Sequence, residues 1–294
     1  MMLDKFDDYL RNEKKFSVHT LTSYIKDVSS FMEYAEEVFE ITKPNDITYV
    51  VIREWIVFLT ESSISPRSVN RKLSSLRKYF SFLRKENFLK EDPLLKHKSL
   101  KVSKKIHPPV SEEEVAEVLQ YIDEVEDFES LRDLLLIELL YTTGIRRNEL
   151  LTLKETDVSM TENLIKVTGK RNKQRIIPLL NVVVSHLNKY MKMKQERFGA
   201  YTSSLFVTNK GKELYPNFIY RVVTYHLSKV SSKQKISPHI LRHAFATHLL
   251  SNGAELNSVK ELLGHASLSS TQIYTHNNIG MLKNTYLNAH PRSK

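Results

Sequence analysis

Six side chains between residues 146 and 274 together have the chemistry needed to break a phosphodiester bond. They are Arg146, Lys170, His239, Arg242, His265 and Tyr274. Two guanidinium groups can hold the nonbridging oxygens of a phosphate and stabilise the charge that develops on them. A tyrosine can attack the phosphorus while lysine and histidine move the protons. Because no paired carboxylates accompany the set, we expect neither a metal ion nor another cofactor.

Arg146 and Lys170 each lie at a junction between predicted elements. Arg146 follows Gly144, which is expected to end a buried helix. Glu149, three residues further on, can hold the guanidinium in a bidentate pair. Lys170 lies in a basic turn between two predicted strands. Considered alone, an exposed arginine and a solvated hairpin tip are the commoner explanation of these two residues.

His239 and Arg242 are expected in the first turns of one helix. Ser237 and Pro238 are typical of a helix start, and the two side chains then lie three residues apart on one face. The free N–H groups and the dipole of a helix N-terminus attract phosphate. The pattern therefore indicates an anion site, and the alternative is a core histidine beside a surface arginine.

The order and spacing of these motifs resemble those of the tyrosine recombinases, a branch of the phage integrase family, and among them the Xer type. The matching stretches are Thr143-Gly-Ile-Arg-Arg-Asn-Glu-Leu150, Gly169-Lys-Arg-Asn-Lys173, His239-Ile-Leu-Arg242, Leu263-Gly-His265 and Ile273-Tyr-Thr-His276. The resemblance covers nearly the full chain and leaves open whether the chain is XerC-like or XerD-like. Arg171 stands where the family often has glycine, which predicts a stiffer turn around Lys170.

The resemblance implies how the phosphate is held. Arg146 and Arg242 bind the scissile phosphate, with Glu149 supporting the first arginine. His265 donates a hydrogen bond to the same phosphate.

The resemblance also implies how the DNA strand is cut. Tyr274 is the nucleophile and forms a 3′-phosphotyrosyl link, His239 is its acid–base partner, and Lys170 protonates the leaving 5′ oxygen. The Xer type further implies the resolution of chromosome dimers before cell division.

The net charge of +10 is concentrated in one stretch of the chain. Between Ile64 and His107 there are thirteen Lys or Arg and three Asp or Glu, while the remainder is balanced. Such a concentration indicates a surface that follows a phosphate backbone. The predicted DNA contacts lie on a helix that begins at Ser65, and they are Arg67, Arg71, Lys72, Lys78 and Lys85. The alternative is a solvated basic face.

Apolar periodicity predicts a mainly α fold with a small β-sheet in the C-terminal domain. Helical spacing covers 17–31, 48–59, 218–230 and 237–250, and two strands are expected at 163–168 and 175–179. A lysine-rich stretch that ends in two prolines predicts a linker at 98–109. We expect residues 1–97 to form a four-helix core-binding domain and residues 110–294 to form an α+β catalytic domain. Together they would make a two-domain clamp on DNA.

The expected partners follow from the same resemblance. They are a double-stranded DNA recombination site, a homo- or hetero-tetramer formed with a second recombinase, and a septal DNA translocase as activator. The chain has no cysteine, no signal-peptide pattern and no stretch apolar enough for a membrane span, so we expect a cytoplasmic protein without membrane contact.

Three alternatives use part of the same pattern. An integrase of a small mobile element has the same chemistry, and a type IB topoisomerase cuts DNA without strand exchange. A helix-turn-helix regulator would use residues 237–263 and would need neither Arg146 nor Tyr274. The apolar residues that follow Tyr274 predict a terminal helix, which either folds back on its own domain or, as the resemblance implies, packs on a neighbouring subunit.

Overall fold

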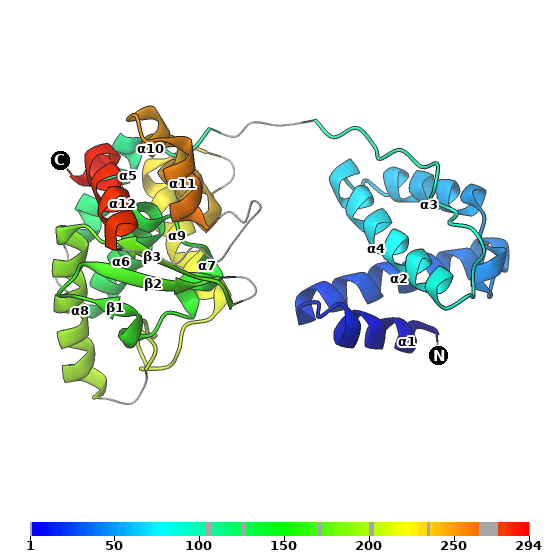
Figure 1. Cartoon of the computed structure of the whole chain (residues 1–294), viewed down its shortest axis with the longest axis horizontal. Helices are drawn as coiled ribbons and strands as arrows, with labels where there is room; N and C mark the ends of the chain where they lie inside the picture. The colour runs from blue at the N-terminus through cyan, green and yellow to red at the C-terminus, as the bar shows by residue number, and fades with distance from the viewer. Residues whose placement is uncertain are drawn as a thin grey trace. The chain divides into compact units, whose positions relative to one another are not determined.

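The computed structural model divides the chain into two compact units, residues 1–106 and 107–294. It describes residues 2–103, 108–124, 127–169, 172–199, 203–233, 236–264 and 276–293, and of residues 276–279 and 281–282 only the backbone. Both units are mainly helical, as the sequence predicts (Figure 1). None of the described helices is both long and apolar enough to cross a bilayer.

The described residues of the N-terminal unit form four α-helices. They are α1 (Met2–Asp8), α2 (Val18–Phe39), α3 (Tyr49–Glu61) and α4 (Pro66–Lys85), with a π-helical turn at Tyr9–Glu13 and a 3₁₀ turn at Pro44–Asp46. Their apolar faces enclose one core, in which Trp55 of α3 meets Phe31 of α2 edge-on at a centroid distance of 5.1 Å. The expected four-helix domain is therefore confirmed.

Helix α4 separates its apolar residues from its basic ones. The hydroxyl oxygen of Ser65 accepts a hydrogen bond from the backbone N–H of Ser68 at 3.4 Å, and Pro66 takes the first helical position, where its missing N–H costs nothing. The buried side of the helix carries Val69, Leu73, Leu76, Phe80 and Leu83. Four residues follow one another along the opposite side and form the basic row of α4: Arg67, Arg71, Lys78 and Lys85. Lys72 is half-buried.

The first part of the predicted linker lies along α4. The side-chain amide of Asn70 donates to the carbonyl of Leu100 and accepts from its N–H, both at 2.9 Å. Arg77 donates to the carbonyl of His97 at 3.1 Å. These bonds attach residues 97–100 to the N-terminal unit, whereas residues 104–107 lie outside the described residues.

The C-terminal unit surrounds a small sheet with helices. Its helices are α5 (Glu112–Asp123), α6 (Phe128–Thr143), α7 (Arg147–Leu151), α8 (Asn181–Phe198), α9 (Pro216–Val230), α10 (Pro238–Ser251), α11 (Leu256–Leu263) and α12 (His276–Ala289), with 3₁₀ turns at Glu155–Asp157 and Pro291–Ser293. Ser111 and Glu114 start α5 with a capping box, in bonds of 2.7 and 3.2 Å.

The three strands form one antiparallel sheet in the order β1-β2-β3. They are β1 (Val158–Ser159), β2 (Leu164–Thr168) and β3 (Gln174–Pro178). In the register of β2 and β3, Ile165 pairs with Ile177 and Val167 pairs with Arg175. Because side chains alternate along a strand, Arg175 points to the same buried face as Ile177.

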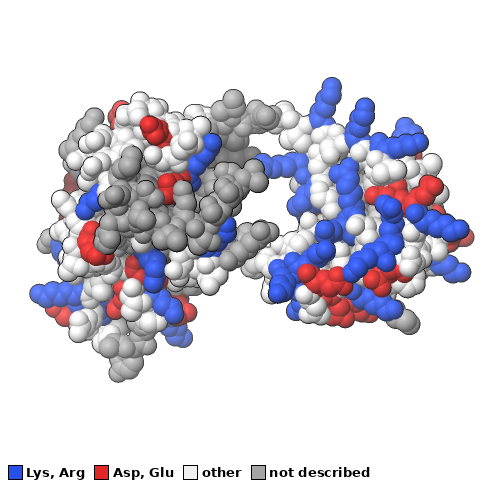
Figure 2. Space-filling model, in the orientation of Figure 1, with Lys and Arg blue, Asp and Glu red and all other residues white. Residues whose placement is uncertain are grey.

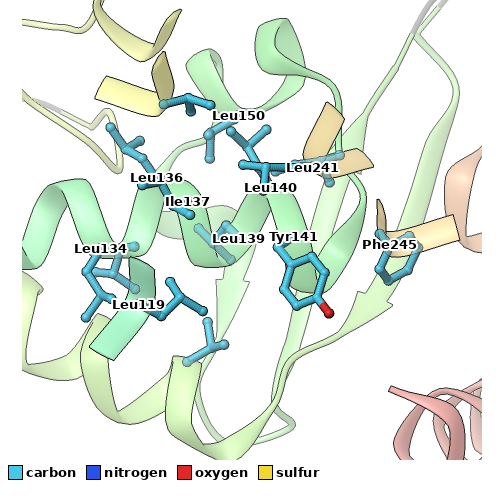
Figure 3. Close-up of a cluster of buried hydrophobic side chains, with 14 of the residues drawn as sticks. Leu119, Leu134, Leu136, Ile137, Leu139, Leu140, Tyr141, Leu150, Leu241 and Phe245 are labelled. Carbon is cyan, nitrogen blue, oxygen red and sulfur yellow. The ribbon is translucent and has the colours of Figure 1, made fainter. Parts of the chain in front are cut away.

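Helix α6 is the centre of this unit. Figure 3 shows its side chains Leu139 and Leu140 within a cluster that includes Leu150 of α7 and Leu241 and Phe245 of α10. The helix ends at Gly144, whose φ of +60° is left-handed, as predicted. The buried helix α6 therefore fixes the position at which the chain reaches Arg146.

The C-terminal segment packs on its own unit. Tyr286, Ala289 and His290 are buried, and the guanidinium of Arg292 lies 2.6 Å from the carboxylate of the fully buried Glu138. Of the two arrangements left open by the sequence, the single chain adopts the first. The side chains of Ile279, Met281 and Leu282, which predicted this helix, lie outside the described residues.

Candidate active site

Arg146 lies at the turn between α6 and α7, immediately before the first residue of α7. Its Nη1 donates to Oε1 of Glu149 at 2.8 Å, and its backbone N–H donates to Oε2 at 2.8 Å. The side chain is 40% exposed, so the guanidinium is anchored at one edge and accessible elsewhere.

The prediction that Arg146 binds Glu149 through two side-chain nitrogens is wrong. The residue that contacts both carboxylate oxygens with two guanidinium nitrogens is Arg175. Nη1 and Nη2 of Arg175 donate to the two oxygens of Glu149 at 3.1 and 2.8 Å, and its Nε donates to the carbonyl of Leu262 at 2.8 Å. Both oxygens of Glu149 therefore accept two hydrogen bonds each. Arg146 uses only one side-chain nitrogen, because the positions facing both carboxylate oxygens are already taken.

Glu149 is ionised throughout the usual pH range. Burial alone would raise the pKa of this carboxyl, but hydrogen bonds from Arg175 and from the backbone of Arg146 outweigh burial and lower the pKa to about 2. The site therefore contains one fixed negative charge between two fixed positive ones.

Arg242 is held by backbone carbonyls at the ends of two helices. Its Nη1 donates to the carbonyl of Gly144, after α6, and its Nη2 donates to that of Leu263, in α11, at 2.8 Å. Burial, followed by the charges of Arg146 and Arg175, lowers the pKa of Arg242 to about 10. The residue therefore stays cationic at neutral pH, and its charge acts on that of Arg146 within the same site.

His239 lies in the first turn of α10 and is exposed. Ser237 does occupy the position before the helix, but its side chain forms no capping hydrogen bond, so the predicted cap is wrong in that detail. Partial burial and then the charges of Arg147, Arg242 and Arg146 lower the pKa of His239 below its usual value. The imidazole is therefore kept neutral and able to accept a proton.

Lys170, His265 and Tyr274 lie outside the described residues, but the glycines that precede two of them are at the site. A Cβ placed on Gly169 would lie 3.2 Å from Oε1 of Glu149, and one placed on Gly264 would lie 3.1 Å from Cδ of Arg175. The described structure thus brings Arg146, Glu149, His239 and Arg242 together and leads the chain from the same place towards Lys170 and His265.

The predicted DNA contacts of α4 share one helix but differ in their surroundings. Arg71 forks onto Asp27 at 2.5 and 2.8 Å, and Lys72, whose side chain is 17% exposed, lies 3.4 Å from the same carboxylate. Lys85 pairs with Glu13 at 2.6 Å. Arg67 and Lys78 form no ion pair with the described part of the chain. Figure 2 shows many Lys and Arg side chains on the visible face of this unit.

Arg175 is the residue at the site that sequence reasoning did not select. The feature of the sequence that could have identified Arg175 is a charged residue at an inward-facing position of a strand, two residues before the buried Ile177. A nearly buried arginine requires an acceptor, because an unpaired charge is strongly disfavoured in the interior.

Comparison with protein families identifies both units. The phage integrase family matches residues 109–280, and the phage integrase N-terminal SAM-like domain matches residues 3–87. The tyrosine recombinase XerC of Listeria innocua is 37% identical over 292 residues, which cover 98% of this chain and 97% of that protein. The tyrosine recombinase XerC of Chlorobaculum parvum is 35% identical over 316 residues, which cover 98% and 94%.

Solved structures agree with this assignment. The XerH site-specific recombinase bound to its difH substrate, in a pre-cleavage complex, has a TM-score of 0.71 and 27% identity, over 96% of this chain and 82% of that one. A lambda integrase dimer bound to a COC′ core site shares the fold, with a TM-score of 0.71 and 18% identity over 97% and 94%. This chain belongs to the phage integrase family, as a tyrosine recombinase of the Xer type.

Proposed function

We propose that this chain recombines double-stranded DNA at a specific site through a 3′-phosphotyrosyl intermediate and thereby resolves chromosome dimers before cell division. The observation that carries the proposal is the pair of guanidinium groups, Arg146 and Arg242, each anchored by acceptors of the protein itself. Fixed donors need little reorganisation when charge develops on a phosphate, which is the main source of electrostatic catalysis. The DNA substrate is supported by the difH-bound XerH relative, and the Xer type by the XerC relatives. The chromosomal role is what the resemblance to the Xer type implies.

The proposed reaction is a transesterification at phosphorus. The phenolic oxygen of Tyr274 forms a bond to phosphorus as the bond to the 5′ oxygen breaks, while His239 takes the phenolic proton and Lys170 supplies one to the leaving oxygen. Arg146, Arg242 and His265 hold the nonbridging oxygens. The ester bond is kept in the protein–DNA link, so a 5′ hydroxyl of another strand reverses the step without an external energy source.

The proposed assembly is a tetramer, of one or of two recombinases, in the cytoplasm. Residues 1–97 and 110–294, joined by 98–109, would close on the duplex as a clamp, and α4 would supply backbone contacts through Arg67, Arg71, Lys72, Lys78 and Lys85. A septal DNA translocase would activate the complex.

The decisive test is a nicked suicide duplex that carries the host chromosome's dimer-resolution site. The wild-type chain should form a covalent adduct that survives denaturing electrophoresis. Tyr274→Phe should bind the duplex normally and form no adduct, because attack requires the hydroxyl and backbone contacts do not. An adduct with the Phe variant would remove Tyr274 from the role of nucleophile.

The same assay separates the chromosomal role from that of a mobile-element integrase. The integrase would react with the ends of its own element and leave the chromosomal site uncut. Sequence-specific binding without any adduct would instead support a DNA-binding regulator. The α10–α11 pair disfavours that regulator, because Arg242 attaches both helices to the end of α6.

A further inference from the structure

We propose that Arg175 is a positioning residue for the cleavage step and acts on the scissile phosphate through Glu149 and Arg146. The inference rests on the proposed function and names a residue beyond the six motif residues and Glu149. Arg175 itself is too deeply buried to touch DNA, with 6% of its side chain exposed. Its influence must therefore pass through the groups that it contacts.

Arg175 joins three separate segments of the chain. It stands on β3, just after the turn that carries Lys170, and its fork holds Glu149 of α7. Its Nε donates to the carbonyl of Leu262, in the last turn of α11, which precedes His265. One planar group with donors in fixed directions thus sets the distance between the hairpin, the first arginine and the end of α11.

The charge of Arg175 frees Arg146 for an external anion. The carboxylate of Glu149 is buried, with 5% of its side chain exposed, and requires a full positive partner. Arg175 supplies that partner from the interior, so Arg146 satisfies Glu149 with a single side-chain nitrogen and keeps the rest of its fork. Without Arg175, Glu149 would draw the whole guanidinium of Arg146 towards itself and away from the phosphate.

The pair packs closely against two glycines. Side-chain atoms of Glu149 lie against Gly169, and those of Arg175 lie against Gly264, at 3.1 to 3.2 Å from the positions where a Cβ would stand. Gly264 also has a φ of +64°. A displacement of Arg175 would therefore disturb Gly264 directly and Gly169 through Glu149.

The test compares Arg175→Lys with Arg132→Lys. Arg132 is a matched control, because it is equally buried in the same unit and paired with a carboxylate, that of Asp133 at 2.8 Å, but it lies away from the site. Each variant is assayed for single-turnover cleavage of two suicide duplexes. One carries the normal scissile phosphate. The other carries a methylphosphonate, in which a methyl group replaces one nonbridging oxygen and removes its negative charge.

Arg175→Lys keeps the positive charge and loses the pair of guanidinium nitrogens that contacts both oxygens of Glu149. We expect it to cleave the phosphate duplex about tenfold more slowly than wild type, a part of the 10²–10³ effect typical of losing one oxyanion donor, and to come within about threefold of wild type on the methylphosphonate. Arg132→Lys should cleave both duplexes at the wild-type rate. Combining Arg175→Lys with Glu149→Gln should slow cleavage no further than the slower single variant, because both changes act on one pathway.

Equal deficits of Arg175→Lys on the two duplexes, or a wild-type rate on both, would overturn the proposal. Multiplying effects in the double variant would do the same. If Arg175→Lys does not fold, Glu149→Gln combined with Arg175→Gln replaces both charges by neutral amides, and the same selective relief on the methylphosphonate is expected. A wild-type chain that forms no adduct on the phosphate duplex would count against the proposed function and not against Arg175 alone.

Discussion

At the scale of single residues, the site is defined by how each charge is held. Arg242 is fixed by two carbonyl oxygens, and Arg146 by one carboxylate oxygen and its own backbone. Neither arginine uses its whole set of donors in these bonds. The remaining N–H groups are oriented in advance and are available to an anion.

The lowered pKa of His239 predicts a pH dependence. The base must be neutral to take the tyrosine proton, so cleavage falls as pH decreases through the pKa of His239. After burial, the charge of Arg147 is the largest cause that holds this pKa below its usual value of 6.5. Arg147→Gln removes that charge, so the pKa rises and the acid limb of the cleavage rate moves to higher pH.

The measurement is the single-turnover cleavage rate between pH 5 and pH 8 with saturating duplex. Arg197→Gln, which pairs with Glu129 at the surface, serves as a control of equal charge change. An acid limb that stays in place in Arg147→Gln would show that a different group sets it.

Individual residues also show which parts of the site could be predicted from the sequence. Arg146, Glu149, His239 and Arg242 were selected because their motifs have fixed spacing, and the structure brings them together. The fork onto Glu149 could not be predicted, because Arg175 is 26 positions away along the chain and reaches Glu149 only when β3 packs beside α7. A spacing rule for one helix cannot include a donor from another element.

At the scale of elements, the turn between α6 and α7 is set by close packing. A Cβ on Gly144 would overlap the ring of Phe245 and lie 2.9 Å from Cδ2 of Leu263. The left-handed φ of Gly144 adds a conformational penalty of about 1–2 kcal/mol for any other residue. Only glycine allows α10 and α11 to approach the end of α6, where Arg242 binds.

Gly144→Ala should therefore destabilise the C-terminal unit more than Gly253→Ala does. Gly253 also has a left-handed φ, +87°, but a Cβ there would meet nothing within 4 Å. We expect about 1–2 kcal/mol for Gly253→Ala from the backbone alone, and about 1–3 kcal/mol more for Gly144→Ala from overpacking. Urea unfolding of the two variants measures the difference in the free energy of unfolding. Equal decreases in the two variants would mean that the ring of Phe245 can move aside without cost.

The basic row of α4 predicts a graded salt dependence. Arg67→Gln and Lys78→Gln should each lower the slope of log binding constant against log salt by about one, since each removes one phosphate contact. Lys85→Gln should lower it less, because Glu13 already neutralises Lys85 in the free protein. Lys192→Gln, on the exposed side of α8, is the matched control and should leave the slope unchanged.

An unchanged slope in Arg67→Gln and Lys78→Gln would place the row away from the DNA. Five of the six predicted elements begin and end within two residues of their predicted bounds, since helical and strand periodicity are local. Helix α2 is the exception, because it ends at Phe39, eight residues beyond the predicted end at residue 31. Ser237 shows the limit, because whether a serine at a helix start actually caps it depends on the backbone angles of that one residue.

At the scale of the whole molecule, the two units were predictable and their attachments were not. The lysine-rich, proline-ended stretch indicated a boundary near residue 100. That residues 97–100 bind to Asn70 and Arg77 depends on tertiary contacts, as does the docking of the C-terminal segment on Glu138. A polar residue within an apolar run, such as Glu138 in α6, indicates that a partner exists. The sequence does not show which residue that partner is.

The docked C-terminal segment leads to a prediction about assembly. In the single chain, Tyr286 is fully buried and Arg292 neutralises Glu138, which also accepts a hydrogen bond from His186 at 2.8 Å. If the segment leaves its own unit to pack on a neighbouring subunit, as the family resemblance implies, these contacts oppose assembly. A substitution that weakens these contacts and keeps the segment should then lower the stability of the single chain and favour assembly.

We therefore compare truncation after Asn278 with Arg292→Gln. Both should lower the free energy of unfolding, the latter by about 1–3 kcal/mol because Glu138 loses one of two partners. Both should still bind a single half-site. Truncation should abolish cooperative binding to a full site and strand exchange, whereas Arg292→Gln should bind the full site at least as cooperatively as wild type, as measured by electrophoretic mobility shift. Normal recombination by the truncated chain would refute exchange of the segment, and a loss of cooperativity in Arg292→Gln as large as that on truncation would mean that assembly requires the segment to stay docked on its own unit.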